Sequence, residues 1–121
     1  MQPEERDAAH LWDMIEAARA VLRFTEGLSL QGFLADDAEL IRLAVERKLE
    51  ILGEAARRTS QAFREQHPEI PWKETIGLRN LISHEYDKVN YKEIYRIVRE
   101  RVWRLAEQLV PLVPPLPEPR E

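Results

Sequence analysis

Residues 36–56 read DDAELIRLAVERKLEILGEAA, and this stretch predicts the centre of the fold. Its apolar side chains recur every three to four positions, which is the period of an α-helix. They cover more than one side of that helix: Leu40, Ile41, Leu43, Ala44, Val45, Leu49, Ile51, Leu52, Ala55 and Ala56. We therefore expect a central helix, or one that lies between the core and a partner chain. Asp36 followed by Glu39 fits a capping box at its start.

The rest of the chain shows the same helical period and lacks the strict alternation of a half-buried β-strand. The expected helices span about residues 7–25, 36–56, 71–84 and 90–109. The second of them has a short continuation to about residue 66. Thr59 or Ser60 fits the cap of the continuation, and Asn90 fits the cap of the last helix. Pro71 suits the first turn of the third helix, where a missing N–H costs nothing.

These elements predict an all-α fold, a four- to five-helix antiparallel bundle over residues 1–110. Residues 111–121 contain five prolines and are expected to form an extended or disordered tail. The wide apolar surface of residues 36–56 favours a two-fold homodimer.

The length of 121 residues predicts a single domain, and the composition, with 44% hydrophobic and 33% charged residues, is typical of a soluble protein. Cysteine is absent, which excludes a disulfide framework, a thiolate nucleophile and a cysteine metal site, and suits a reducing, cytoplasmic setting. No stretch approaches the roughly 20 apolar residues of a membrane span. The formal net charge of −4 means that any nucleic-acid role must rest on a local basic patch.

The segment RNLISHEY, residues 79–86, carries the strongest candidate chemistry. Arg79 is a permanent, fork-shaped phosphate ligand. His84 can take or give a proton near neutral pH. Together they could break a phosphodiester without a metal, with His84 accepting the proton of a ribose 2′-OH and Arg79 stabilising charge on the phosphorus oxygens.

Helical geometry places supporting polar residues beside this pair. Arg79, Ser83 and Tyr86 share one side of the third helix, and Asn80 lies with His84 on the adjacent strip. The apolar side chains Leu78, Leu81 and Ile82 are expected to point into the core. A structural interpretation stays open, since a histidine at a helix end often only caps carbonyl groups.

Other charged and aromatic groups are weaker candidates. Arg47, Glu50 and Glu54 form a line at i, i+3 and i+7, which predicts a salt-bridge row or the border of a cleft. His10 and His67 have no companion ligands at suitable spacing, which argues against a metal site. The last helix is basic, with Lys92, Arg96, Arg99, Arg101 and Arg104. The three tryptophans suit a core or an interface: Trp12, Trp72 and Trp103.

At these residues the chain resembles the HepT-like toxins of the HEPN superfamily. Arg79 to Tyr86 matches their R-x4-H-x-Y motif. The segments RKLEILGEA (residues 47–55), PEIPW (68–72) and GLRN (77–80) resemble the family's second helix and its approach to the motif. The likeness covers about residues 7–110, and the three segments in order are far more specific than R-x4-H alone.

The resemblance implies a homodimer with a cleft that holds both motifs, and metal-independent RNA cleavage by a toxin without a cofactor. It implies that Arg79 and His84 are catalytic, with Asn80 and Ser83 beside them. It also implies a partner, an antitoxin of the minimal nucleotidyltransferase type, which would transfer AMP from ATP to Tyr86.

Two other hypotheses remain open at this point. A catalytically silent HEPN subunit would bind and regulate a nucleotidyltransferase, or present substrate to it, and the acidic net charge favours this reading. A plain helical dimer would have no active site. The intact Arg79 and His84 pair favours the ribonuclease.

Overall fold

The structure is a computed structural model that describes residues 3–82 and 89–114. Its α-helices are α1 (Pro3–Phe24), α2 (Leu30–Leu34), α3 (Glu39–Arg58), α4 (Gln61–Gln66), α5 (Trp72–Ile82), α6 (Tyr91–Ile97) and α7 (Trp103–Leu109). Short 3-10 turns cover Asp36–Ala38 and Val110–Leu112, and a π-helical turn covers Val98–Val102. These residues contain helices and turns but no strand, which confirms the predicted all-α class.

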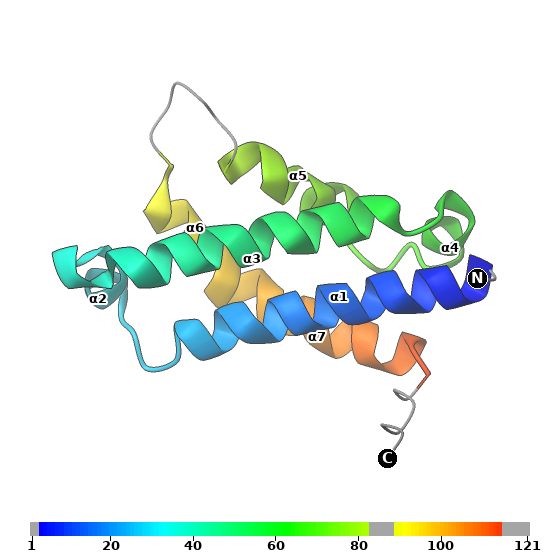
Figure 1. Cartoon of the computed structure of the whole chain (residues 1–121), viewed down its shortest axis with the longest axis horizontal. Helices are drawn as coiled ribbons and strands as arrows, with labels where there is room; N and C mark the ends of the chain where they lie inside the picture. Colours follow the sequence, from blue (N-terminus) through cyan, green and yellow to red (C-terminus); the bar gives the residue numbers. More distant parts are fainter. Residues whose placement is uncertain (1–2, 83–88, 115–121) are drawn as a thin grey trace, which may run out of the picture.

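The long helices pack as antiparallel neighbours around one core (Figure 1). α3 lies between α1 and α5, and α6 with α7 returns along α1. The core is formed by the apolar stripes of these helices, which include Met14, Ile15, Val21, Val45, Leu49, Leu52, Ile94, Val98, Val102 and Leu109. The expected antiparallel bundle and the central place of α3 are therefore confirmed.

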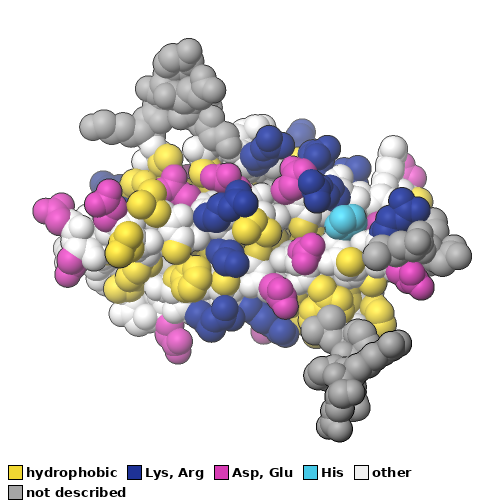
Figure 2. All heavy atoms as spheres, viewed as in Figure 1, with side chains coloured by type: hydrophobic (Ala, Val, Ile, Leu, Met, Phe, Trp, Pro, Cys, Tyr) yellow, Lys and Arg dark blue, Asp and Glu magenta, His cyan; other side chains and the backbone are white. Residues whose placement is uncertain are grey.

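The apolar surface of α3 exceeds what the core buries. Leu40 is 81% exposed and Leu43 is 49% exposed, and Leu30 of α2 is 36% exposed. Apolar side chains gather toward the α2 end of the face that carries α1 and α3 and again at its opposite end, while Lys and Arg are interspersed with Asp and Glu between them (Figure 2). The wide stripe seen in the sequence thus remains partly uncovered in a single chain.

The start of α3 differs from the predicted capping box. Residues Asp36–Ala38 form a 3-10 turn, and Ala38 occupies the N-cap position without a side-chain hydrogen bond. Arg42 organises this corner, because its Nη1 donates to the carbonyl oxygens of Phe33 and Ala35, each at 2.7 Å. The capping-box prediction was wrong because the chain enters α3 through this turn and not directly from an extended residue.

The cap of α4 follows the sequence prediction. The backbone N–H of Phe63 donates to Ser60 Oγ at 3.1 Å. Ser60 also binds Asp7 of α1, with its Oγ donating to Oδ2 at 2.7 Å and its backbone N–H donating to Oδ1 at 2.8 Å. Thr59 plays a different part, since its hydroxyl donates to the carbonyl oxygen of Ala55 at 3.0 Å. Ser60 therefore caps α4 and fastens it to α1.

The segment between α1 and α3 contains a helix where the sequence predicted only a break. Ser29 caps α2 by accepting the backbone N–H of Gly32 at 3.0 Å. Phe33 is fully buried and packs against the rings of Tyr91 and Tyr95, with centroid distances of 6.2 and 5.6 Å. Five residues carry too little periodicity to reveal a helix, and tertiary packing of Phe33 stabilises this one.

The last helix begins as predicted but is not regular. Asn90 accepts the backbone N–H of Glu93 at 3.1 Å, which confirms its cap. The helix then passes through the π turn at Val98–Val102, which separates α6 from α7. Within this turn Arg99 Nη2 donates to the carbonyl oxygens of Thr25 and Leu28 at 2.7 and 2.8 Å. The predicted uniform 3.6-residue period is interrupted there.

The proline-rich tail is folded at its beginning. Val110–Leu112 forms a 3-10 turn, and Leu112 and Val113 pack against the core. Trp12 Nε1 donates to the carbonyl oxygen of Pro114 at 3.1 Å. Within the expected tail, Pro111 and Leu112 thus lie in a 3-10 turn and Val113 has an extended backbone, while residues 115–121 lie outside the described residues. None of the described helices is long and apolar enough to cross a membrane.

Candidate active site

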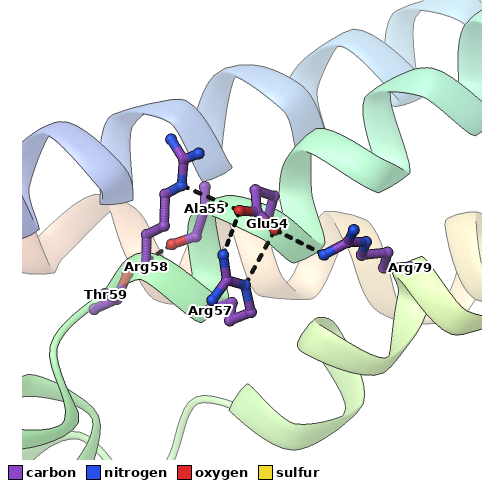
Figure 3. A network of polar contacts seen from close by, with 6 residues as sticks. All are labelled: Glu54, Ala55, Arg57, Arg58, Thr59 and Arg79. Atoms are coloured by element: carbon purple, nitrogen blue, oxygen red, sulfur yellow. Dashed lines mark hydrogen bonds and ion pairs between the residues drawn. The ribbon is translucent and has the colours of Figure 1, made fainter.

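Arg79 lies on the exposed side of α5, as the motif predicts. Its side chain is 57% exposed, and its Nη1 donates to Glu54 Oε2 of α3 at 3.3 Å (Figure 3). Within residues 3–82 and 89–114, Glu54 is the one acceptor that the Arg79 guanidinium contacts. A guanidinium carries five N–H donors, so most of its binding capacity faces outward.

Two further arginines share the carboxylate of Glu54. Arg57 donates to it through Nε at 3.2 Å and Nη2 at 2.6 Å, and Arg58 donates through Nε at 3.1 Å. The pKa of Glu54 is lowered from 4.5 to about 2, chiefly by the hydrogen bond from Arg57 and further by the charges of Arg57, Arg58 and Arg79. The cluster holds three guanidinium groups and one carboxylate, so it keeps a net charge of +2.

A glycine in α3 brings this cluster together. Gly53 is buried, and a Cβ built on it would lie 3.1 Å from the carbonyl oxygen of Thr75 and 3.4 Å from the backbone nitrogen of Arg79. Any larger residue would press against the backbone of α5. Gly53 therefore lets α3 and α5 approach closely enough for Glu54 and Arg79 to meet.

Arg79 and Glu54 border a shallow hollow of about 360 Å³ between α1 and α3. Its lining is mostly polar and charged: His10, Asp13, Arg47, Glu50, Ile51, Glu54, Ala55, Arg58 and Arg79. The hollow gathers Arg47, Arg58 and His10 next to the motif arginine, and these are groups that bind phosphate oxygens.

The charged line on α3 fits both interpretations that the sequence allowed. Arg47 and Glu50 form an exposed pair at 3.7 Å, which is a salt bridge along the helix. Glu54 belongs to the arginine cluster and borders the hollow. The charged line could be seen in the sequence, but the hydrogen bond between Arg79 and Glu54 could not be predicted from it. That contact joins residues 25 positions apart on different helices.

The other predicted site residues divide between described and undescribed parts of the chain. Asn80 is exposed beside Arg79, and Leu78 and Ile82 are buried as expected. Leu81 is 45% exposed, so its predicted place in the core was wrong. Ser83, His84 and Tyr86 lie outside the described residues.

The basic last helix forms no continuous free patch in the part of the chain that the structure describes. Arg96 is paired with Glu93 and with Glu100, the latter at 2.8 Å, and Arg99 is bound to backbone carbonyl groups. Arg101 and Arg104 border a second, more apolar hollow of about 330 Å³ beside α5. Arg96 and Arg99 are therefore engaged within the chain, whereas Arg101 and Arg104 are exposed beside this hollow.

His67, Trp72 and Trp103 do not line the hollow beside Arg79. His67 stacks on Phe63 with a centroid distance of 4.4 Å, and its Nδ1 lies 3.3 Å from Glu69 Oε1. Trp72 is buried, whereas Trp103 is 41% exposed beside Arg104. Within the described ranges, no group of three or more His, Cys, Asp or Glu side chains is arranged to hold a metal ion.

Comparison with known proteins identifies the class of this bundle. The family model described as "Ribonuclease HepT-like" matches residues 14–112, so the chain belongs to the HepT-like ribonuclease family. The match spans the helices that position Arg79 and its neighbours as well as the motif segment.

Individual relatives agree with this assignment. The chain is 40% identical over 101 residues to "Putative RNase MJ1380" of Methanocaldococcus jannaschii, which covers 84% of this chain and 91% of that protein. It is 34% identical over 93 residues to "Probable ribonuclease HepT" of Thermococcus cleftensis, covering 77% and 83%. It is 32% identical over 100 residues to "Putative RNase TTE0752" of Caldanaerobacter subterraneus, covering 83% and 88%. A search of the solved structures found no match.

Proposed function

We propose that this chain is a metal-independent RNA endonuclease, the toxin of a toxin–antitoxin pair. The observation that carries the proposal is the exposed guanidinium of Arg79, held on α5 at the border of a hollow that Arg47 and Arg58 also line. Membership of the HepT-like ribonuclease family supports it, and so do the ribonuclease names of the relatives. His84, five residues after Arg79, completes the motif.

The reaction assigns one task to each motif residue. His84 accepts the proton of the ribose 2′-OH, and the 2′-oxygen attacks the adjacent phosphorus. Arg79 stabilises the negative charge that builds on the phosphorus oxygens. The bond to the 5′-oxygen breaks, that oxygen takes up a proton, and the products are a 2′,3′-cyclic phosphate and a 5′-hydroxyl. No step uses a metal ion.

Two copies of the chain would give a more complete site than one. A single chain offers one Arg79 and one His84, which is a small set for a nuclease. The exposed Leu40 and Leu43 of α3 offer an apolar surface that a second copy would cover. The proposal therefore includes a two-fold homodimer with both motifs in one cleft.

Cleavage of RNA by the purified chain tests the nuclease directly. Arg79→Ala and His84→Ala should each reduce the cleavage rate by about 10²–10⁴-fold, the usual loss when a charge-stabilising donor or an acid–base group is removed. Arg19→Ala and His67→Ala are matched controls, because both residues lie away from the hollow. EDTA should leave the rate unchanged. Wild-type cleavage by His84→Ala would refute the catalytic assignment.

The proposed partner is a minimal nucleotidyltransferase that transfers AMP to Tyr86. The phenol oxygen of Tyr86 attacks the α-phosphorus of ATP, its proton is lost to a base, and pyrophosphate leaves. The new phosphodiester carries one negative charge, which would pair with Arg79 and repel the RNA backbone. Co-expression with such a partner should add AMP units to the wild-type mass and none to Tyr86→Phe, which should keep its nuclease activity.

A second function is a catalytically silent subunit that binds the nucleotidyltransferase. The net charge of −4 favours it, since an acidic chain repels the RNA backbone. This alternative predicts AMP transfer to the chain but no RNA cleavage by the chain alone, so the two assays above separate the two functions.

A further inference from the structure

We infer that Glu54 is a positioning residue for Arg79, fixing the motif guanidinium against α3 so that its remaining N–H groups face the hollow. This inference rests on the proposed function, because it concerns how the nuclease site is held. It begins with the four hydrogen bonds that the Glu54 carboxylate accepts (Figure 3).

These four bonds use the full accepting capacity of Glu54. Oε1 accepts Arg57 Nη2 and Arg58 Nε, and Oε2 accepts Arg57 Nε and Arg79 Nη1. A carboxylate has about four lone-pair positions, so each is filled. The carboxylate is therefore held from three sides and cannot rotate without breaking bonds, which makes it a fixed support for Arg79.

A role for Glu54 as a general base does not fit these contacts. A base must have a lone pair that can approach the substrate hydroxyl, and Glu54 has none left within the cluster. Its lowered pKa, caused chiefly by the hydrogen bond from Arg57, also makes it a weak proton acceptor near neutral pH. The proton transfers of the reaction thus belong to other groups.

A role as an inhibitor of Arg79 does not fit either. Arg57 binds Glu54 through two N–H groups, the shorter at 2.6 Å, and neutralises most of its charge. Arg79 makes a single contact at 3.3 Å and stays 57% exposed. The contact therefore orients Arg79 while leaving its charge and most of its donors available to a phosphate.

The contact contributes little to the stability of the fold. Exposed ion pairs add little to the stability of a protein because water and salt screen them, and the side chains of Arg57, Arg58 and Arg79 are all more than half exposed. Loss of Glu54 should therefore change the function of Arg79 much more than the melting temperature. This difference separates a positioning role from a structural one.

The test compares Glu54→Gln with Glu93→Gln in the full chain. Glu93 is also a partly exposed carboxylate paired with an arginine, Arg96, but it does not line the hollow. Glu54→Gln should lower kcat for a model RNA by about 10–100-fold with a small change in KM, as expected when a reacting group is misplaced. Glu93→Gln should stay within about threefold of wild type. Glu54→Asp, which keeps the charge but shortens the side chain, should also lose activity.

Two further measurements make the inference falsifiable. In an Arg79→Ala background, Glu54→Gln should cause no additional loss, because it acts through Arg79. The Arg79 Nε–H signal in ¹⁵N NMR should be ordered in wild type and averaged in Glu54→Gln. Wild-type kcat with an ordered signal, or a gain in kcat, would overturn the inference. Absence of RNA cleavage by wild type would refute the nuclease, while the NMR comparison would still decide the role of Glu54.

Discussion

A Cβ atom at Gly53 of α3 would lie 3.1 Å from the carbonyl oxygen of Thr75 in α5. Real Cβ atoms rarely come so close to a backbone oxygen, so glycine is the residue that allows this approach. The next residue along α3 is Glu54, which contacts Arg79 one turn further along α5. The spacing of α3 and α5 and the position of the motif arginine therefore both depend on the close approach of the two helices at Gly53.

Gly53→Ala should reduce RNA cleavage more than it reduces stability. Alanine favours a helix over glycine by about 1 kcal/mol, but here the added methyl must push α5 away from α3. Gly77→Ala in α5 is the matched control, because nothing lies within 4 Å of its added Cβ. Thermal unfolding should show a clear rise in Tm for Gly77→Ala and a smaller rise or a fall for Gly53→Ala. Equal Tm gains with unchanged cleavage would contradict the close approach.

The small stabilising effect of Glu54, which solvent screens, should disappear in acid. Its folded-state pKa is about 2, below the 4.5 of an unpaired glutamate, mainly because of the hydrogen bond from Arg57. The stabilisation is present above the unfolded value and is lost as the pH falls from about 4.5 toward 2. The difference in unfolding free energy between wild type and Glu54→Gln should therefore shrink over this range in denaturant titrations. A difference independent of pH would show that the ion pairs do not matter.

Ser60→Ala should destabilise the fold by about 1–2 kcal/mol, near the upper end for loss of an N-cap. The change removes the acceptor for the Phe63 N–H and one of the two hydrogen bonds to Asp7. Ser29→Ala is the control, since Ser29 caps the short α2 at the surface. Its cost should be smaller. Chemical denaturation of the two variants measures the difference, and equal costs would mean that the link to Asp7 adds nothing.

Leu40→Glu should weaken the proposed homodimer without unfolding the chain. Leu40 is 81% exposed, so the change costs little packing within one chain. Light scattering at micromolar concentration should give wild type twice the 14.2 kDa of one chain and the variant a lower average mass. Lys48→Gln, which lowers the charge by the same single unit, is the control on the same helix. A wild-type monomer would remove the shared cleft from the proposal.

Much of the fold could be predicted from local sequence patterns. The stripe of α1, the caps at Ser60 and Asn90 and the central place of α3 all depend on residues within a few positions of one another. The short α2 and the π turn at Val98–Val102 could not be predicted this way. Each depends on contacts made elsewhere, through the burial of Phe33 and through Arg99 binding the end of α1.

The site shows the same division. The sequence by itself determined the motif from Arg79 to Tyr86 and the exposure of Arg79 on the polar side of α5. Only the tertiary structure decided that Leu81 is exposed and that Glu54 holds Arg79. Periodicity and capping depend on neighbours within one or two helical turns, whereas a contact between helices depends on how closely their backbones approach. That approach is set by Gly53, whose effect appears only when α5 is packed against it.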